Sequence, residues 1–287
     1  MKILIPVLLL FCNLSFSQNQ RFSYDYSFVK DTLNKQEVTK ELMNLDILKE
    51  GSVFYSRDVY VSDSIVNAYF DNQIKTTGSM NVDTKLLSQR KGNVKYKILK
   101  KYPDFKVFSA LKIGMDSYKV ADDRKIVWKI LPERQKIGEF NAQKATTEFA
   151  GRQWVAWFTS ELPFQDGPYK FHGLPGLIVK LEDHTKTHQF ELIGVSKFTP
   201  NPEKTSEFIV ENKDIEINQK QYKKIFLENR NDPSKVMKQA IANGAIIQLT
   251  DPNGNKISTA EMIKKREQNA KSKNAKDNNI IEIDLLQ

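Results

Sequence analysis

Side chains able to support acyl transfer stand close together in the middle of the chain. Ser160, Asp166 and His172 follow one another in sequence, and a hydroxyl, a carboxylate and an imidazole are the groups of a hydrolase triad. However, no Gly-x-Ser-x-Gly sequence surrounds Ser160, and that sharp turn is what exposes the nucleophile in many hydrolases. We therefore interpret the Ser160 segment as a loop and predict no catalytic residues.

A second pattern could bind a divalent metal. His184 and His188 flank a short turn that follows Glu182 and Asp183, and two imidazoles with a carboxylate are a legitimate ligand set. The spacing belongs to a turn and not to the helical His-Glu-x-x-His of zinc hydrolases. Exposed turn histidines are the simpler interpretation. We predict no metal site and no other cofactor.

A third pattern favours ligand binding. Tyr169, Lys170 and His172 precede a glycine-rich turn and could line a cleft, while Trp157 could stack on a sugar ring. These four residues are the candidate ligand-binding set. Core packing is the alternative use for the aromatic side chains, and it is the commoner one for tryptophan.

The segment after them, Gly173-Leu174-Pro175-Gly176-Leu177-Ile178, is punctuated by glycine and proline. Proline at the second and glycine at the third position of Leu174–Leu177 predict a type II turn, because glycine tolerates the positive φ needed there. Leu177 then continues as an alternating strand. We interpret the segment as a rigid connection into a core strand.

The N-terminus predicts export. Lys2 precedes an apolar run from Ile3 to Phe11, and Ser15-Phe16-Ser17 is a small-x-small cleavage site. We therefore expect a signal peptide over residues 1–17. The sole cysteine, Cys12, lies within it, so the mature chain would have no thiol, and none of its segments is long and apolar enough to span a bilayer.

Composition excludes some partners. The 287 residues carry 44 lysines and arginines against 35 aspartates and glutamates, so the net charge of +9 is basic but moderate. The lysines are spread along the chain, which is typical of a solvated sheet face and not of a nucleic-acid-binding patch. We predict no nucleic-acid partner, and keep acidic lipid or polysaccharide as a weaker alternative.

Most of the first two hundred residues alternate with the two-residue period of half-buried strands. Phe22, Tyr24 and Tyr26 alternate with polar residues, and Leu177–Leu181 is expected to pair with Phe190–Gly194. Other predicted strands lie at 42–48, 94–98, 105–113, 116–120, 126–130 and 154–158. Residues 57–71 fit either a helix or two irregular strands.

The clearest helical signals lie in the C-terminal third. Asn218 with Gln221 resembles a capping box, Asp232-Pro233 predicts an N-cap with proline at the first helical position, and Ser258 opens a third helix. A hairpin is expected over 246–257 and a solvated helix fraying into a tail over 264–279. The predicted fold is mainly β (α+β): a curved antiparallel sheet, or an open barrel or bowl, with two to three C-terminal helices.

The chain resembles the GLPGLI family of Bacteroidetes cell-envelope proteins, whose hexapeptide stands intact at Gly173–Ile178. Lys144-Ala145-Thr146-Thr147, Trp157-Phe158-Thr159 and Gly167-Pro168-Tyr169-Lys170-Phe171 also match. The resemblance covers residues 21–200 well and the C-terminal third loosely, where Asn278–Glu282 departs from the family's Asn-Pro-Ile-Glu ending. It implies a signal-peptide-bearing, mainly-β envelope protein and brings no catalytic residues.

Together these patterns predict a signal peptide (1–17), one mainly-β domain with C-terminal helices (18–260) and a polar helix with tail (261–287). The expected location is the periplasm or the outer membrane's surface. The expected function is binding a partner protein or ligand without a catalytic site. Outer-membrane transport or secretion components are the partners that the family context suggests. The alternative is an envelope hydrolase acting on glycan or peptide, with His172 and Asp166 or Glu161 taking part.

Overall fold

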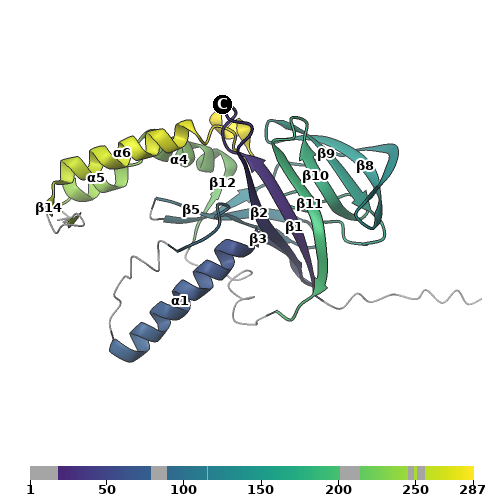
Figure 1. The fold of residues 1–287 in the computed structure, drawn as a ribbon, viewed down its shortest axis with the longest axis horizontal. Coiled ribbons are helices and arrows are strands. Elements are labelled where there is room, and N and C mark those ends of the chain that lie inside the picture. The colour runs from purple at the N-terminus through teal and green to yellow at the C-terminus, as the bar shows by residue number, and fades with distance from the viewer. Residues whose placement is uncertain (1–18, 79–88, 115, 201–213, 245–248, 251–255) are drawn as a thin grey trace, which may run out of the picture.

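The computed structural model describes residues 19–78, 89–114, 116–200, 214–244, 249–250 and 256–287 (Figure 1). The predicted signal peptide and Cys12 lie outside these residues, and so does much of the hairpin expected over 246–257. The elements, in chain order, are β1 (Gln20–Val29), β2 (Val38–Ile47), β3 (Gly51–Ser56), α1 (Arg57–Thr77), β4 (Lys97–Lys101), β5 (Lys106–Ile113), β6 (Asp116–Asp122), β7 (Lys129–Ile137), β8 (Phe140–Phe149), β9 (Arg152–Thr159), β10 (Leu177–Asp183), β11 (His188–Lys197), β12 (Ile215–Asn218), α4 (Gln219–Asn231), α5 (Lys235–Ala242), β13 (Leu249–Thr250), β14 (Lys256–Ile257), α6 (Thr259–Ala275) and the 3-10 turn η1 (Ile283–Leu286).

Twelve of the described strands form one sheet in the order β12-β6-β5-β4-β3-β2-β1-β11-β10-β9-β8-β7. Every neighbouring pair is antiparallel except β12 and β6. The sheet does not close, because β7 and β12 lie at opposite edges. The prediction of a mainly-β fold with an open antiparallel sheet and C-terminal helices is confirmed.

The two-residue period of β1 shows why these segments become strands. Phe22, Tyr24 and Tyr26 are buried, whereas the residues between them are half-buried. The tyrosine ring of residue 26 stacks on Phe190 of β11, with ring centroids 4.0 Å apart. The expected pairing of β10 with β11 is also present, with Leu181 opposite Phe190. Alternation thus places one apolar face of the sheet in the core.

The sheet curves around the connection between β9 and β10. Tyr169, Phe171 and Leu174 of this connection belong to the same buried cluster as side chains of β1, β3 and β9. The Tyr24 hydroxyl on β1 donates a 2.8 Å hydrogen bond to the carbonyl of Ile178 on β10. We call residues 160–176 the interior loop, because residues 166–171 and Leu174 are buried.

Residues 57–77 form a helix, which resolves the choice left open by their sequence. The Ser56 side chain caps α1 by accepting from the Val59 amide, and Gly78 ends the helix in the left-handed conformation. The capping box of Asn218 and Gln221 is present at α4, and Ser258 caps α6. Figure 1 shows α4, α5 and α6 packed together as an arm that extends from the sheet.

Three details differ from the sequence predictions. The expected strand over 94–98 begins only at Lys97. Helix α5 begins at Lys235 with Ser234 as its N-cap, two residues later than Asp232-Pro233 predicted, because the chain makes a turn at Pro233. The end of the chain also packs against the sheet, with Asn279, Glu282 and Leu285 buried. None of the described helices has the length and apolar composition needed to cross a membrane.

Candidate functional site

The interior loop packs its aromatic side chains into the deepest part of the core. The Phe171 ring lies 4.9 Å from that of Trp154 and 5.4 Å from that of Phe149, measured between centroids. The Trp154 indole N–H donates to the Phe149 carbonyl, and the Trp128 indole N–H donates to the His172 carbonyl. Both tryptophans therefore serve packing and hydrogen bonding within the fold.

The Gly173–Ile178 segment leads the loop back into β10. Leu174, Leu177 and Ile178 are buried, whereas Gly173 and Pro175 are exposed. The turn is not the predicted type II turn: the Leu174 carbonyl accepts from the Gly176 amide, and the Leu177 amide donates to the Leu162 carbonyl. A Cβ on Gly176 would lie 2.1 Å from the Thr159 carbonyl oxygen, and the φ of +148° also disfavours a side chain. Gly176 is needed mainly for close backbone approach.

The first polar cluster of the site surrounds Asp166. Its carboxylate pairs with the Lys100 ammonium of β4 and accepts hydrogen bonds from the Ser52 and Tyr102 hydroxyls, each 2.5 Å long. The Lys100 ammonium also donates to the Gly167 carbonyl at 2.7 Å. Both charged side chains are 1% exposed or less. Burial lowers the pKa of Lys100, and Asp166 opposes that effect.

His172 lies beside this cluster. Its backbone forms an antiparallel bridge with Asp166, and its ring stacks on Phe105 at a centroid distance of 4.6 Å. Burial, aided by the nearby Lys100 charge, lowers the pKa of His172 to about 4. The imidazole is therefore neutral at physiological pH. The bridge places the backbones of Asp166 and His172 side by side.

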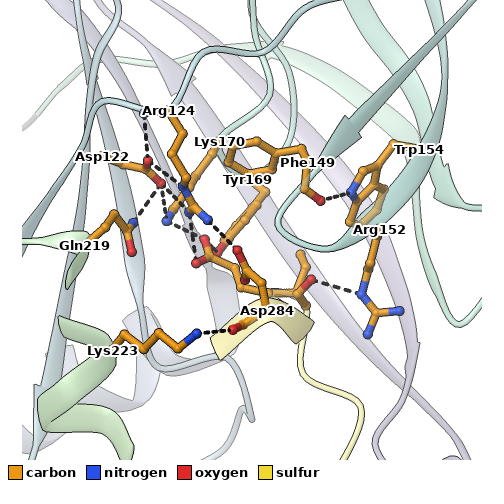
Figure 2. Close-up of polar contacts among 12 residues, drawn as sticks. Asp122, Arg124, Phe149, Arg152, Trp154, Tyr169, Lys170, Gln219, Lys223 and Asp284 are labelled. Carbon is orange, nitrogen blue, oxygen red and sulfur yellow. Dashed lines mark hydrogen bonds and ion pairs between the residues drawn. The ribbon is translucent and has the colours of Figure 1, made fainter. Parts of the chain in front are cut away.

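The second polar cluster surrounds Lys170 (Figure 2). Its ammonium pairs with Asp122 at the end of β6, 2.8 Å away, and with Glu282 near the end of the chain. Arg124 pairs with the same two carboxylates, at 2.6 and 3.0 Å. All three buried members of the cluster (Lys170, Asp122 and Glu282) are less than a tenth exposed. Two cations thus neutralise two carboxylates inside the fold.

Glu282 is ionised within this cluster. Burial works against its charged form, but the Lys170 and Arg124 charges outweigh burial and hold the pKa of Glu282 below its usual range. The Tyr169 hydroxyl donates a 2.6 Å hydrogen bond to the same carboxylate. Tyr169 and Lys170, two of the predicted ligand-binding residues, therefore contact the chain's own C-terminal segment in this structure. Their binding of another ligand stays a prediction.

Residues 278–286, which we call the C-terminal strap, are also held by Arg152 of β9. The guanidinium donates to the Ile280 and Ile281 carbonyls at 2.7 and 3.0 Å, and to the Asn279 side chain at 2.6 Å. A further bond joins Arg152 to the buried carboxylate of Asp183. One side chain thus connects the strap to two strands of the sheet.

His188 also contacts the strap, and this contact fixes the tautomer of the His188 imidazole ring. The Nε2 atom lies 2.9 Å from the Asn279 carbonyl, which can only accept, so Nε2 carries the proton. Nδ1 then accepts from the Tyr26 hydroxyl at 2.7 Å. Burial, with the nearby Arg152 charge, lowers the pKa of His188 to about 4. Both ring nitrogens are therefore engaged with the protein.

The remaining candidate residues lie apart from these clusters. Ser160 is exposed, and the exposed Glu161 accepts from the Asn141 backbone and side chain. Trp157 points to the other face of β9, where it packs beside Val179. His184 is exposed whereas His188 is buried. Within the described residues, no three His, Cys, Asp or Glu side chains are grouped as metal ligands would be.

The residues that hold the clusters together were not predicted from the sequence. Lys100 stands beside Lys101 in a lysine-rich stretch, Asp122 stands in a turn-like pair, and Glu282 lies in the tail that follows a long polar tract. Their pairing depends on contacts between parts of the chain that are distant in sequence. The spacing of residues along the chain does not predict such contacts. One signal was available: Ile280 and Ile281 form an apolar pair after a long polar tract, and such a pair favours a buried position.

Comparison with known proteins adds a family model and a fold. The model of a family described as a protein of unknown function (Porph_ging) matches residues 148–180, a stretch that includes the interior loop and the glycine-proline turn. None of the curated proteins matches the chain.

Among solved structures, two of PNGF-II, in the P21 and C2 space groups, share the fold. Each has a TM-score of 0.50, with 16% and 15% sequence identity respectively. Each match covers 74% of this chain but only 34% or 33% of the PNGF-II chain. The chain therefore spans about a third of the length of PNGF-II, and at this identity the likeness concerns the fold alone.

Proposed function

We propose that this protein is an exported cell-envelope protein of the GLPGLI type that binds a partner protein and has no catalytic role. The signal-peptide pattern at residues 1–17 and the intact hexapeptide at Gly173–Ile178 support the location and the family. The charged side chains beside the hexapeptide pair with each other: Asp166 with Lys100, and Glu282 with Lys170. Such pairing suits a scaffold, because the groups stabilise the fold and are shielded from substrate.

The observation that carries the proposal is an apolar row on α1. Val61, Ile65 and Tyr69 lie four residues apart on one helical face and are 46%, 56% and 38% exposed. The row extends about 12 Å at 1.5 Å per residue. Val66 is the one buried residue of this 21-residue helix. Figure 1 shows α1 extending away from the sheet. Exposed apolar rows of this kind mark protein interaction sites.

The surroundings of the row define the partner's chemistry. A hollow of about 750 Å³ lies between α1 and residues 89–91, lined by Val61 and Ile65, by the basic side chains of Arg57, Arg90 and Lys91 and by the acidic Asp58. Arg90 pairs with Asp63 at 3.6 Å, so Arg57 and Lys91 are the cations that remain for a partner. A partner that inserts apolar side chains and places carboxylates around them would complement this surface. An outer-membrane transport or secretion component with such a segment is the partner we propose.

Photocrosslinking in intact cells tests this surface. A photoreactive amino acid at Ile65 should give one discrete protein adduct, and Val61→Ser should abolish it, because the partner then loses an apolar contact. The same amino acid at Asn67 is the control, since residue 67 is exposed on the opposite face of α1. Equal adducts from both positions, or none from either, would contradict partner binding through α1.

An envelope hydrolase is the second candidate, because the fold brings His172, as a neutral imidazole, next to Asp166. A neutral imidazole can accept a proton, as a general base must. If His172 is that base, a gene carrying His172→Gln would fail to restore the function lost when the natural gene is deleted. A gene carrying His184→Gln, at an exposed turn, would restore it. An unchanged phenotype with His172→Gln, in a protein of normal stability, would end the hydrolase hypothesis at this residue.

A further inference from the structure

The net charge of the chain is concentrated in its helical arm. Residues 219–277, which contain α4, α5 and α6, carry 13 lysines and arginines against 6 aspartates and glutamates. Their net charge of +7 is most of the +9 of the whole chain, and the other 228 residues are nearly neutral. The lysines are thus spread along the whole chain, but the excess of positive over negative charge is concentrated in residues 219–277.

Ion pairs within the arm occupy four of its six acidic groups; of the other two, Glu261 is exposed at the start of α6 and Asp251 lies outside the described residues. Glu228 pairs with Lys235, and Asp232 and Glu267 both pair with Lys238, at nitrogen–oxygen distances of 2.7 to 3.1 Å. Asp277 lies 3.9 Å from Arg230. These pairs join the helices to one another. The carboxylates are thereby occupied between the helices and do not neutralise the outer lysines.

Helix α6 presents the unpaired cations. Lys264, Lys265, Lys271 and Lys273 are exposed, and within the described part of the chain none of them has a carboxylate at ion-pair distance. Met262 is the one buried residue of α6. The four lysines span about 14 Å along the helix at 1.5 Å per residue. At about 100° per residue, Lys264, Lys265 and Lys271 share the outer face, whereas Lys273 lies at its margin, toward the side of Met262. In Figure 1, α6 covers α4 and α5 and forms one side of the extended arm.

We propose that the outer face of α6 docks the protein on the surface of an anionic lipid bilayer. A bilayer is a broad, diffuse array of phosphate charge, and lysines suit it, since their compact ammonium groups attract charge without the two-point geometry of arginine. The helix has a polar outer face, so it adsorbs to headgroups and does not insert into acyl chains. This surface is separate from the α1 row, and the two can be tested independently.

Vesicle co-sedimentation of the chain from Gln18 onward tests the proposal, because the apolar run of the predicted signal peptide could itself bind vesicles. Vesicles of phosphatidylcholine with phosphatidylglycerol should bind the protein, those of phosphatidylcholine alone should not, and added salt should weaken binding because it screens charge. Lys264→Gln, Lys265→Gln, Lys271→Gln and Lys273→Gln together should lower the partition coefficient by about a hundredfold or more, at roughly fivefold per lysine. Glutamine keeps helix propensity, so circular dichroism should stay unchanged.

The matched control removes the same charge from the sheet. Lys106, Lys112, Lys129 and Lys136 are exposed on β5 and β7, and their replacement by glutamine gives the same net charge. This variant should bind the anionic vesicles nearly as well as the natural sequence. Equal losses for both variants, or no binding to anionic vesicles, would overturn the proposal. Binding to soluble polyphosphate with none to vesicles would also overturn it, in favour of a soluble polyanion.

Discussion

At the scale of single residues, the stability of the fold depends strongly on the buried ion pair of Lys100 and Asp166. Lys100→Met keeps the length of the side chain but leaves the Asp166 carboxylate buried without its cation. Removing one partner of a buried pair costs about 3–5 kcal/mol of unfolding free energy. Urea denaturation should show this loss, whereas Lys101→Met at the exposed neighbouring position should change little. Equal effects of the two substitutions would mean that the pair does not stabilise the fold.

Two histidines make stability depend on pH in a defined window. Burial lowers the pKa values of His172 and His188 from 6.5 to about 4. Between these values the folded state binds fewer protons than the unfolded state, so stability rises with pH and is lost as the pH falls from 6.5 to 4. For His188 the loss is about 3 kcal/mol, at 1.36 kcal/mol per pKa unit.

The three histidines allow this origin to be checked. Unfolding free energies measured from pH 7 to pH 4 should fall less steeply in His188→Gln and in His172→Gln than in the natural sequence. His184→Gln is the control, because its side chain is exposed. The lowered pKa values of Asp183 and Glu282 act in a different window, since their contribution is lost only below about pH 4. An unchanged slope in both buried-histidine variants would contradict the assignment.

At the scale of elements, the alternation of apolar and polar residues predicted most strands, because one face of each strand is buried. β1 and β9 follow this rule closely, and β10 follows it from Val179 onward. β3 was missed because all six of its residues are buried, which erases the period, and β8 was missed because small and polar residues fill its inner positions. The helices at Asn218 and Ser258 were predictable from local capping chemistry.

The two glycines of the hexapeptide, Gly173 and Gly176, have different roles. Replacing each of them by alanine should distinguish these roles. Gly173 has a φ of +91° with no atom near a new Cβ, so Gly173→Ala should cost about 1–2 kcal/mol from backbone strain alone. Gly176→Ala adds a collision with the Thr159 backbone and should cost more than about 3 kcal/mol. Urea midpoints of the two variants provide the comparison. Similar midpoints would mean that β9 moves to make room.

At the scale of the whole molecule, the C-terminal strap joins segments that are distant in sequence. Arg152 is separated by 127 residues from Asn279, and Lys170 by 112 from Glu282. Local patterns predicted the elements but not this assembly, because a charged residue gives the same signal whether water or a distant partner solvates it. The ligand-binding set was therefore predicted from residue type alone, and the contacts of Tyr169 and Lys170 with Glu282 could only come from the three-dimensional structure.

Arg152→Lys tests the strap. Lysine keeps the charge but cannot place several donors in one plane, so bonds to the Ile280 and Ile281 carbonyls are lost. We expect a loss of about 1.5–3 kcal/mol in unfolding free energy. Compared with the natural sequence, amide hydrogen exchange should become faster at residues 279–285, and more so there than in the rest of the chain. Arg134→Lys is the control, since that exposed arginine has a side-chain contact with Gln143. Unchanged exchange in the strap would contradict this role for Arg152.

The position of the strap in the chain also bears on how folding proceeds. The carboxylate that neutralises Lys170 and Arg124 arrives more than a hundred residues after Lys170. Until residue 282 is available, these two cations share only the Asp122 carboxylate. Contacts so distant in sequence form slowly, because a long loop must close first. The charges in the interior of the sheet are therefore balanced only when the strap has docked, so a chain that ends before residue 282 would keep one buried cation in excess.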